Sequence, residues 1–231
     1  MSFHLAGIVP VVTKPMDFCM DWHDCLMPLA PNFYAIERAA LECAYAACET
    51  IWIPIFYVPS DKKHDNKNHC ISWAILHGAK TAYDISNDLS KWFAPDRFYV
   101  SFCHGVYPPR GLRPSRREIS KNINFAVTFR DKSFATNNLL GFTFNIEQMN
   151  QAINLFKSTE KSLLWREELE NEKEYYEENF TLDKVFSHVI LYTDERLEVP
   201  WFHQIDGWEN YCQFLASSEK SEMRHPGKLI I

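Results

Sequence analysis

The sequence is poor in glycine, with 7 glycines against 12 prolines in 231 residues, and it contains no internal repeat or low-complexity tract. At 46% apolar and 15% aromatic residues, this composition excludes a disordered or fibrous chain and predicts a globular protein. No apolar stretch approaches the length needed to span a membrane, so we expect no membrane partner. Residues 1–7 have neither a charged start nor a long apolar run, so we also expect no secretory leader.

The chain also lacks an excess of positive charge. Its formal net charge of −6 at pH 7 argues against a general electrostatic affinity for nucleic acid. The 7 cysteines are an odd number, which we interpret as free thiols of a cytoplasmic protein. The zinc-type ligands between His64 and His77 match no closed zinc motif. The length suits one domain over residues 1–231, with residues 217–231 as a flexible tail.

The first 58 residues predict an apolar strand, a long polar loop, a helix and a second apolar strand. We expect the first strand at residues 4–12, the loop at 13–31, a helix capped by Asn32, and a strand at 50–58 that is buried on both faces. Such a unit is a crossover between parallel strands. It leaves the loop at the carboxyl end of the first strand, where open α/β sheets bind their ligands.

The remaining sequence continues in the same alternating manner. It predicts strands at residues 96–106, 124–129 and 139–144, and short strands at 189–192 and 197–201. It predicts helices at 70–89, 146–156 and 207–216, and a helix start at 180–190 that is capped by Thr181 or Asp183. An exposed acidic helix is expected within 157–179. We therefore predict an α/β fold: a single domain with a mixed, mostly parallel central sheet flanked by helices on both faces.

Several polar residues are candidates for chemistry. Asp21, His23 and Asp24 in the long loop can bind a divalent metal or exchange protons, or they can form a solvated turn. Cys103 and His104 are adjacent on a strand and point to opposite faces, so they do not form a nucleophile–base pair with each other. His104 ends that strand and can face a ligand there.

Two further groups fit phosphate and sugar recognition. A basic segment can bind phosphates bidentately through its arginines, or it can be an exposed face that balances nearby acids; its members are Arg110, Arg113, Arg116, Arg117 and Lys121. Trp201 and Trp208 flank Asp206 and can pack against a sugar or a base, although an aromatic core explains them as well.

Four blocks resemble, in their order, the nucleotide-sugar pyrophosphorylases, also called sugar nucleotidyltransferases. The blocks are LAGIVPVV (5–12) followed by HDCLMPL (23–29), CISWAILHGA (70–79) followed by FYVSFCHG (98–105), LGFTF (140–144) followed by FTLDKV (180–185), and WFHQIDGWENY (201–211). Together they cover most of the chain. The resemblance implies the nucleotidyltransferase fold, a nucleoside triphosphate and a sugar phosphate as ligands, and Mg²⁺ as cofactor.

The resemblance also implies roles for individual residues. Asp206 matches the family's second metal-binding carboxylate. We assign catalytic roles to Lys14, His23 and Asp24, and substrate binding to Gly7, His104, Arg110, Arg113 and Trp208. The sequence departs from the family pattern at three places. Cys103-His104-Gly105 stands where the first metal-binding aspartate is expected, residues 9–12 replace the glycine-rich loop, and His23-Asp24 replaces the lysine before Leu-Leu-Pro.

Three hypotheses follow. The first is a divergent nucleotidyltransferase that joins a nucleoside triphosphate to a phosphorylated sugar. The second is a catalytically reduced member of the fold that serves as a binding or structural module, with a protein partner or a second copy of itself. The third is a glycosyltransferase-like enzyme that uses a nucleotide-sugar, against which we find no Asp-x-Asp at a strand end. Direct nucleic-acid binding would depend on the arginine segment alone. The motif losses suit a phage-encoded copy.

Overall fold

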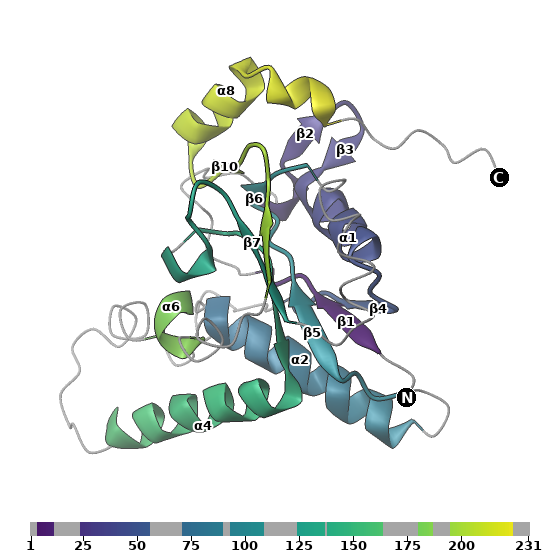
Figure 1. Cartoon of the computed structure of the whole chain (residues 1–231), viewed down its shortest axis with the longest axis vertical. Coiled ribbons are helices and arrows are strands. Elements are labelled where there is room, and N and C mark those ends of the chain that lie inside the picture. Colours follow the sequence, from purple (N-terminus) through teal and green to yellow (C-terminus); the bar gives the residue numbers. More distant parts are fainter. Residues whose placement is uncertain are drawn as a thin grey trace, which may run out of the picture.

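The structure, a computed structural model, describes residues 4–11, 24–55, 71–89, 93–108, 124–136, 138–163, 180–186 and 195–223. A central sheet has the strand order β4-β1-β5-β8-β7-β9 (Figure 1). Its strands are β1 (Leu5–Ile8), β4 (Thr50–Trp52), β5 (Arg97–Val100), β7 (Phe125–Thr128), β8 (Phe142–Asn145) and β9 (Glu195–Glu198). The predicted α/β fold with a mixed, mostly parallel sheet is confirmed.

The sheet has its topological switch at β1. Strand β1 is parallel to both of its neighbours, β4 and β5, while β8 is antiparallel to both β5 and β7, and β9 is parallel to β7. The chain leaves β1 for β4 on one side and then returns to β5 on the other side. In open α/β sheets the carboxyl ends of the two strands at such a switch frame a crevice, and ligands bind there.

Helices cover both faces of the sheet. Helices α1 (Ala35–Tyr45) and α8 (Trp208–Ala216) share one core with Leu5, Tyr99 and Phe125. Helices α2 (Ile71–Asp88), α4 (Ile146–Leu163) and α6 (Leu182–Val185) share the other core with Phe98 and Phe142. Because successive strand residues point to opposite faces, Phe98 and Tyr99 belong to different cores.

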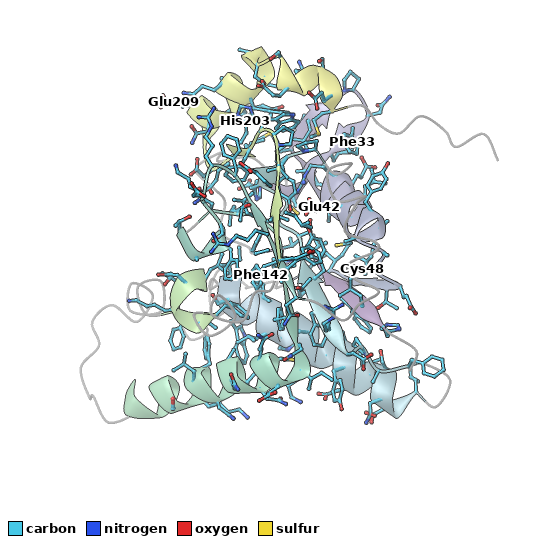
Figure 2. All side chains as sticks on the ribbon, in the orientation of Figure 1. Phe33, Glu42, Cys48, Phe142, His203 and Glu209 are labelled. Atoms are coloured by element: carbon cyan, nitrogen blue, oxygen red, sulfur yellow. The ribbon has the colours of Figure 1, made fainter. Side chains whose placement is uncertain are left out.

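Aromatic side chains fill the second core. The Phe142 ring, labelled in Figure 2, is stacked on Phe134 with centroids 3.9 Å apart and meets Phe186 edge-on at 5.2 Å. Phe134 belongs to the short η4 (Phe134–Thr136). Phe156 of α4 is stacked on Phe180 at 3.8 Å, which fixes the chain just before α6. No helix in the described ranges is long and apolar enough to cross a bilayer.

The described residues also form two small two-stranded sheets. One pairs β2 (Pro28–Ala30) with β3 (Phe33–Tyr34), and the other pairs β6 (Gly105–Val106) with β10 (His203–Gln204). The first follows η1 (Asp24–Leu26), and the Tyr211 hydroxyl of α8 donates to the Pro28 carbonyl at 2.6 Å. Helix α8 therefore lies beside β2 and β3, at the opposite end of the molecule from α4 (Figure 1).

Helix α1 begins later than expected. Asn32 has φ 54° in the turn between β2 and β3, and Tyr34 is the N-cap residue. The Glu37 carboxylate accepts the Tyr34 amide at 2.9 Å, which satisfies one helix-start donor. The prediction that Asn32 caps this helix is wrong, because the β2–β3 hairpin needs a residue that tolerates a positive φ at this position.

Strand β4 differs most from its prediction. We expected residues 50–58 to be buried on both faces, but β4 ends the described sheet and exposes isoleucines at every second position. Ile51, Ile53 and Ile55 are 39%, 40% and 65% exposed. The intervening Pro54 and Trp52 face α2 instead. An apolar run does not distinguish an edge strand from a central strand, and this is the reason for the error.

Most other elements lie where the sequence predicts them. Helix α2 starts and ends within one residue of the expected range, and β7, β8 and α8 fall inside or beside theirs. Helix α4 continues to Leu163, but residues 164–179 and 187–194 lie outside the described residues. Within the predicted tail, η5 (Glu219–Glu222) follows α8, the Trp201 indole donates to Glu222 at 3.0 Å, and Met223 is buried. The flexible tail over residues 217–231 stays a prediction.

Candidate functional site

The candidate site is the turn that follows β5, at the switch point of the sheet. Residues 101–104, the strand-end turn, connect β5 to β6, and the Ser101 amide still donates to the Ile8 carbonyl of β1 at 3.0 Å. Strand β6 then pairs with β10, and the Ile205 amide donates to the His104 carbonyl at 2.8 Å. The structure therefore brings together His104 and Asp206, which are about a hundred residues apart in sequence.

Gly105 is essential for this arrangement. A Cβ atom at this position would collide with the Leu139 carbonyl oxygen. The Leu139 amide in turn donates to the Gln204 side chain at 3.1 Å, so the segment before β8 packs directly on the β6–β10 pair. A glycine permits this close backbone approach.

Asp206 presents an exposed carboxylate at the start of α8. One oxygen accepts the Asn210 amide group and the other accepts the Gln204 amide group at 3.4 Å. Each carboxylate oxygen has two acceptor positions, so both retain capacity for a further ligand. The indole of Trp208, in the first turn of α8, is 49% exposed and contacts Tyr211 at 6.0 Å between centroids. The Asp206 carboxylate, a hydrogen-bond acceptor, and the exposed Trp208 indole, a flat apolar surface, are therefore two residues apart in the chain.

The end of the long loop lies against the same turn. Cys25 in η1 and Cys103 in the strand-end turn belong to one hydrophobic core, and they are close enough for Cys25 to affect the pKa of Cys103. Burial, reinforced by the Cys25 thiol, raises the pKa of Cys103 to about 12, so Cys103 remains a thiol at neutral pH. Asp24, the first residue of η1, is buried. A buried, protonated Cys103 agrees with our prediction that it does not form a nucleophile pair with His104.

The remaining predicted residues divide into two groups. Gly7 lies within β1, and a Cβ there would meet the sulfurs of Cys43 at 2.8 Å and Cys48 at 3.3 Å. Its position serves the packing of α1 on the sheet, and its role in substrate binding stays a prediction. The other predicted residues, Lys14, His23, Arg110 and Arg113, lie outside the described residues.

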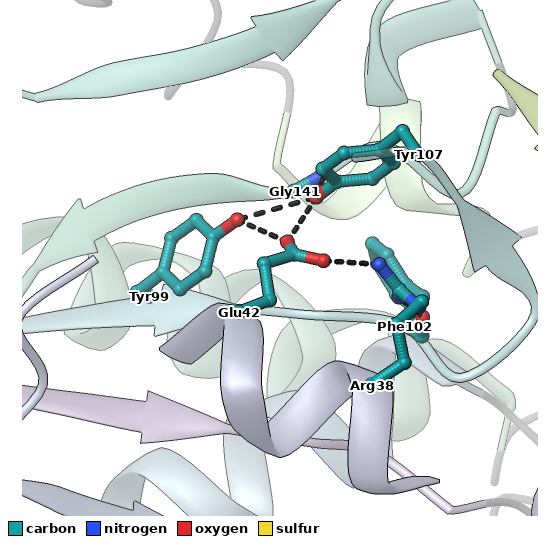
Figure 3. Close-up of polar contacts among 6 residues, drawn as sticks. All are labelled: Arg38, Glu42, Tyr99, Phe102, Tyr107 and Gly141. Atoms are coloured by element: carbon teal, nitrogen blue, oxygen red, sulfur yellow. Dashed lines mark hydrogen bonds and ion pairs between the residues drawn. The ribbon is translucent and has the colours of Figure 1, made fainter. Parts of the chain in front are cut away.

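A buried polar cluster beneath the strand-end turn was not predicted from the sequence. It consists of Arg38, Glu42, Tyr99 and Tyr107, and all four side chains are fully buried (Figure 3). The Glu42 carboxylate pairs with the Arg38 guanidinium through one oxygen and accepts both tyrosine hydroxyls through the other. A signal existed in the sequence, since Arg38 and Glu42 interrupt the small apolar face of α1 at helical spacing.

The cluster reaches beyond its own side chains. Arg38 donates from Nη2 to the Phe102 carbonyl at 2.5 Å, and the guanidinium carbon lies 5.2 Å from the centre of the Tyr107 ring. Burial, and then the charge of Glu42, raise the pKa values of Tyr99 and Tyr107 well above the ordinary value for tyrosine. Burial is the largest single effect and by itself would lower the pKa of Arg38. The charge of Glu42 and its hydrogen bond, together with Tyr107 and Cys103, outweigh burial, so the net shift is upward. The tyrosines therefore donate and the arginine is charged.

The described residues do not form a metal site by themselves. They contain no group of three or more His, Cys, Asp or Glu side chains that could hold a metal ion. Asp206 is the metal ligand that the resemblance implies, and the nearby His104 offers nitrogen, which Mg²⁺ does not favour. Mg²⁺ commonly retains waters and binds one or two carboxylates together with substrate phosphates. Among the described residues, Asp206 therefore fits Mg²⁺ in a site that a bound phosphate completes.

No protein-family model matches the chain, and no curated protein matches it in sequence. Its structure is similar to that of a protein assigned as a glucose-1-phosphate thymidylyltransferase from Bacillus anthracis, in complex with sucrose. The TM-score is 0.57 at 8% identity, over 97% of this chain and 98% of that one.

Two more solved structures give the same result. A UTP-bound UGPase from Acinetobacter baumannii has a TM-score of 0.57 at 9% identity, over 93% of this chain and 92% of that one. A UDP-glucose pyrophosphorylase complexed with UDP-glucose has a TM-score of 0.54 at 9% identity, over 92% and 97% of the two chains. The similarity extends over nearly the whole of each chain, at an identity that shows the fold alone. This chain has the fold of the sugar nucleotidyltransferases.

Proposed function

We propose that the protein is a nucleotidyltransferase-like protein that binds a nucleoside triphosphate and a phosphorylated sugar at the strand-end turn. The observation that carries this proposal is the exposed carboxylate of Asp206, held beside His104 at the switch point of the sheet. The nine-residue helix α8 begins two residues later, and the positive end of its dipole favours a phosphate nearby. The fold, together with this geometry, supports a phosphate-handling site.

The chemistry of the proposed reaction is a phosphoryl-type displacement. An oxygen of the sugar phosphate forms a bond to the α-phosphorus of the triphosphate, the bond from that phosphorus to the bridging oxygen breaks, and pyrophosphate leaves with the electron pair. Mg²⁺, when bound, supplies neutralisation of the phosphate charge.

The residues of this chain contribute by binding and orientation. Asp206 would hold the cation together with the phosphates, and Trp208 would pack against the base or the sugar. His104 would donate to a phosphate or sugar oxygen at the end of β5. The predicted roles of Lys14, His23 and Asp24 in catalysis, and of Arg110 and Arg113 in phosphate binding, complete the proposal.

The proposal is tested by thermal-shift titration with the common nucleoside triphosphates, with and without Mg²⁺. A ligand at a hundred times its dissociation constant adds about 2.7 kcal/mol, or roughly 5–10 °C for a chain of this size. We expect one triphosphate to give such a shift only with Mg²⁺, and Mg²⁺ alone to give none.

Asp206→Asn provides the residue-level test. It should abolish the dependence of triphosphate binding on Mg²⁺ while the circular-dichroism spectrum stays unchanged. Glu209→Gln is the matched control, because it removes the same charge from an exposed position in the first turn of α8 (Figure 2). Undiminished Mg²⁺ dependence in Asp206→Asn would refute the metal role of Asp206. The absence of a shift with every triphosphate would refute the proposed ligand class.

A specific observation favours a second candidate, a binding module without catalysis. The strand-end turn carries Cys103 and His104 where the resemblance leads us to expect the first metal-binding aspartate, and removal of one preorganised stabilising group typically costs about 2.7–4 kcal/mol of barrier. A pyrophosphate-release assay separates the two candidates. Binding of triphosphate without pyrophosphate release, across a panel of sugar phosphates, would support the binding module. A single domain over residues 1–231 and a phage-encoded origin stay predictions.

A further inference from the structure

We propose that Arg38 and Glu42 are positioning residues, which hold the strand-end turn against α1 and so keep the two walls of the candidate site in register. One wall is the strand-end turn with His104. The other is η1 with Asp24, which precedes α1. The proposal rests on contacts that converge on a single turn of one helix (Figure 3).

The first contact fixes the middle of the turn. Strand β5 ends at Val100, so the Phe102 carbonyl lies beyond the hydrogen-bonded ladder of the sheet. A carbonyl that has left the ladder needs another donor when it is buried. Arg38 provides this donor through Nη2, and the guanidinium is held in place by its ion pair with Glu42.

The second and third contacts fix the two ends of the turn. Tyr99 lies in β5, before the turn, and Tyr107 is the first residue after β6, on the other side of the turn. Both hydroxyls donate to the same oxygen of Glu42. The chain from Tyr99 to Tyr107 is therefore tied to α1 at its start, its middle and its end. A helix that only needed to cover the sheet would require apolar contacts alone.

The same helix is tied to the other wall of the site. The Ala35 amide, at the start of α1, donates to the Met27 carbonyl at 2.9 Å, directly after η1. On the far side of the turn, the His104 carbonyl accepts the Ile205 amide and so positions the segment that carries Asp206. Helix α1 is therefore tied to η1 at its start and, through Arg38 and Glu42, to the strand-end turn that holds the Asp206 segment.

A purely stabilising role explains this cluster less well. Buried ion pairs are costly to desolvate, and replacement by well-packed apolar residues is often neutral or stabilising. Polar clusters of this kind are retained in some proteins because they specify one geometry rather than because they add stability. Here the geometry that they specify is that of the proposed site.

The test compares two cluster variants with one control. Tyr107→Phe cuts one attachment without leaving a charge unpaired. Arg38→Met/Glu42→Gln removes both charges together and retains an acceptor for the tyrosines. The control is Phe156→Leu, in the core on the other face of the sheet. If the double variant does not fold, Tyr107→Phe decides alone.

The readout is amide hydrogen exchange. The amide of Ile205 reports on the turn through its bond to the His104 carbonyl, and the amide of Val9, bonded to the Trp52 carbonyl at 2.9 Å, is the reference. Local opening raises exchange at one amide, whereas a general loss of stability raises it at all globally exchanging amides. We expect the cluster variants to raise the ratio of the Ile205 exchange rate to the Val9 exchange rate by about tenfold. We expect Phe156→Leu to leave this ratio unchanged. An unchanged ratio in the cluster variants would overturn the proposal.

A second readout depends on the proposed function. We expect the dissociation constant of the Mg²⁺-triphosphate identified for the wild type to rise by about fivefold or more in the cluster variants and to stay constant in Phe156→Leu. An unchanged dissociation constant in folded cluster variants would overturn their positioning role. If the wild type binds no triphosphate, the proposed function fails, while the exchange ratio still decides whether the cluster positions the turn.

Discussion

At the scale of single residues, Gly141 is required by the two buried tyrosines. A Cβ atom here would lie 2.7 Å from the Tyr107 hydroxyl oxygen and closer still to that of Tyr99. The Gly141 amide also donates to the Tyr107 hydroxyl at 3.2 Å. We expect Gly141→Ala to lower the free energy of unfolding by about 1–3 kcal/mol, because the tyrosines cannot move without breaking their bonds to Glu42. Urea denaturation measures the change.

Gly207 offers a matched control for this prediction. A Cβ atom there would meet nothing within 4 Å, and the residue has an extended backbone and caps α8. Gly207→Ser should change the free energy of unfolding by less than about 0.5 kcal/mol, since serine is a good N-cap residue. If Gly141→Ala proved as stable as the wild type, the tight approach at Gly141 would not be the constraint that we infer.

The residues of the site were predictable to different degrees. His104 was predicted as the end of a strand and Asp206 from its match to the fourth sequence block, and the structure places the two segments side by side. Their roles in binding stay predictions. Arg38 and Glu42 were missed because an oppositely charged pair four residues apart on a helix usually lies on its exposed face. Tyr99 and Tyr107 bury this pair, and their approach depends on the tertiary fold rather than on local sequence.

At the scale of elements, the end of α1 contains backbone strain that glycine would relieve. Ala47 follows the C-cap residue with φ 64°, and the Cys48 amide donates to the Cys43 carbonyl at 3.0 Å, as in a Schellman motif. A left-handed conformation costs a residue with a Cβ roughly 1–2 kcal/mol. We expect Ala47→Gly to raise the free energy of unfolding by about 1 kcal/mol, measured by urea denaturation.

The control is the same substitution one turn earlier. Ala44 is exposed within α1, so Ala44→Gly should lower the free energy of unfolding by about 1 kcal/mol. Opposite signs for two exposed Ala→Gly changes three residues apart would confirm the strained cap. A loss of stability in both variants would contradict it.

Elements were predictable where the local pattern sufficed. The range of α2 follows from its helical periodicity, and its prediction is accurate to one residue at each end. The cap of α1 and the burial of β4 were wrong because both depend on what lies next to the segment. Asn32 belongs to the β2–β3 hairpin, which the local sequence does not predict. In the described sheet, β4 is an edge strand with a neighbouring strand on one side only. Local patterns specify neither of these contexts.

At the scale of the whole molecule, the sheet buries several weak acids that are protonated in the folded state. Burial is the largest cause that raises the pKa values of Cys43, Tyr99, Cys103 and Tyr107. For Cys103 the pKa rises from 9.0 to about 12. Between these values the unfolded chain has lost the proton and the folded chain retains it. The unfolded state therefore binds fewer protons, and the free energy of unfolding must fall as the pH rises.

This linkage predicts a loss of stability at alkaline pH with a defined window. Below pH 9 the Cys103 thiol contributes no pH dependence, and between pH 9 and 12 it lowers the free energy of unfolding by up to about 1.4 kcal/mol per pH unit. Urea unfolding from pH 8 to pH 11 should show the decline. Cys103→Ala should reduce its slope by about that amount. Cys212→Ala, at an exposed position, should leave the slope unchanged. Equal slopes in both variants would mean that Cys103 ionises as readily in the folded protein as in the unfolded chain.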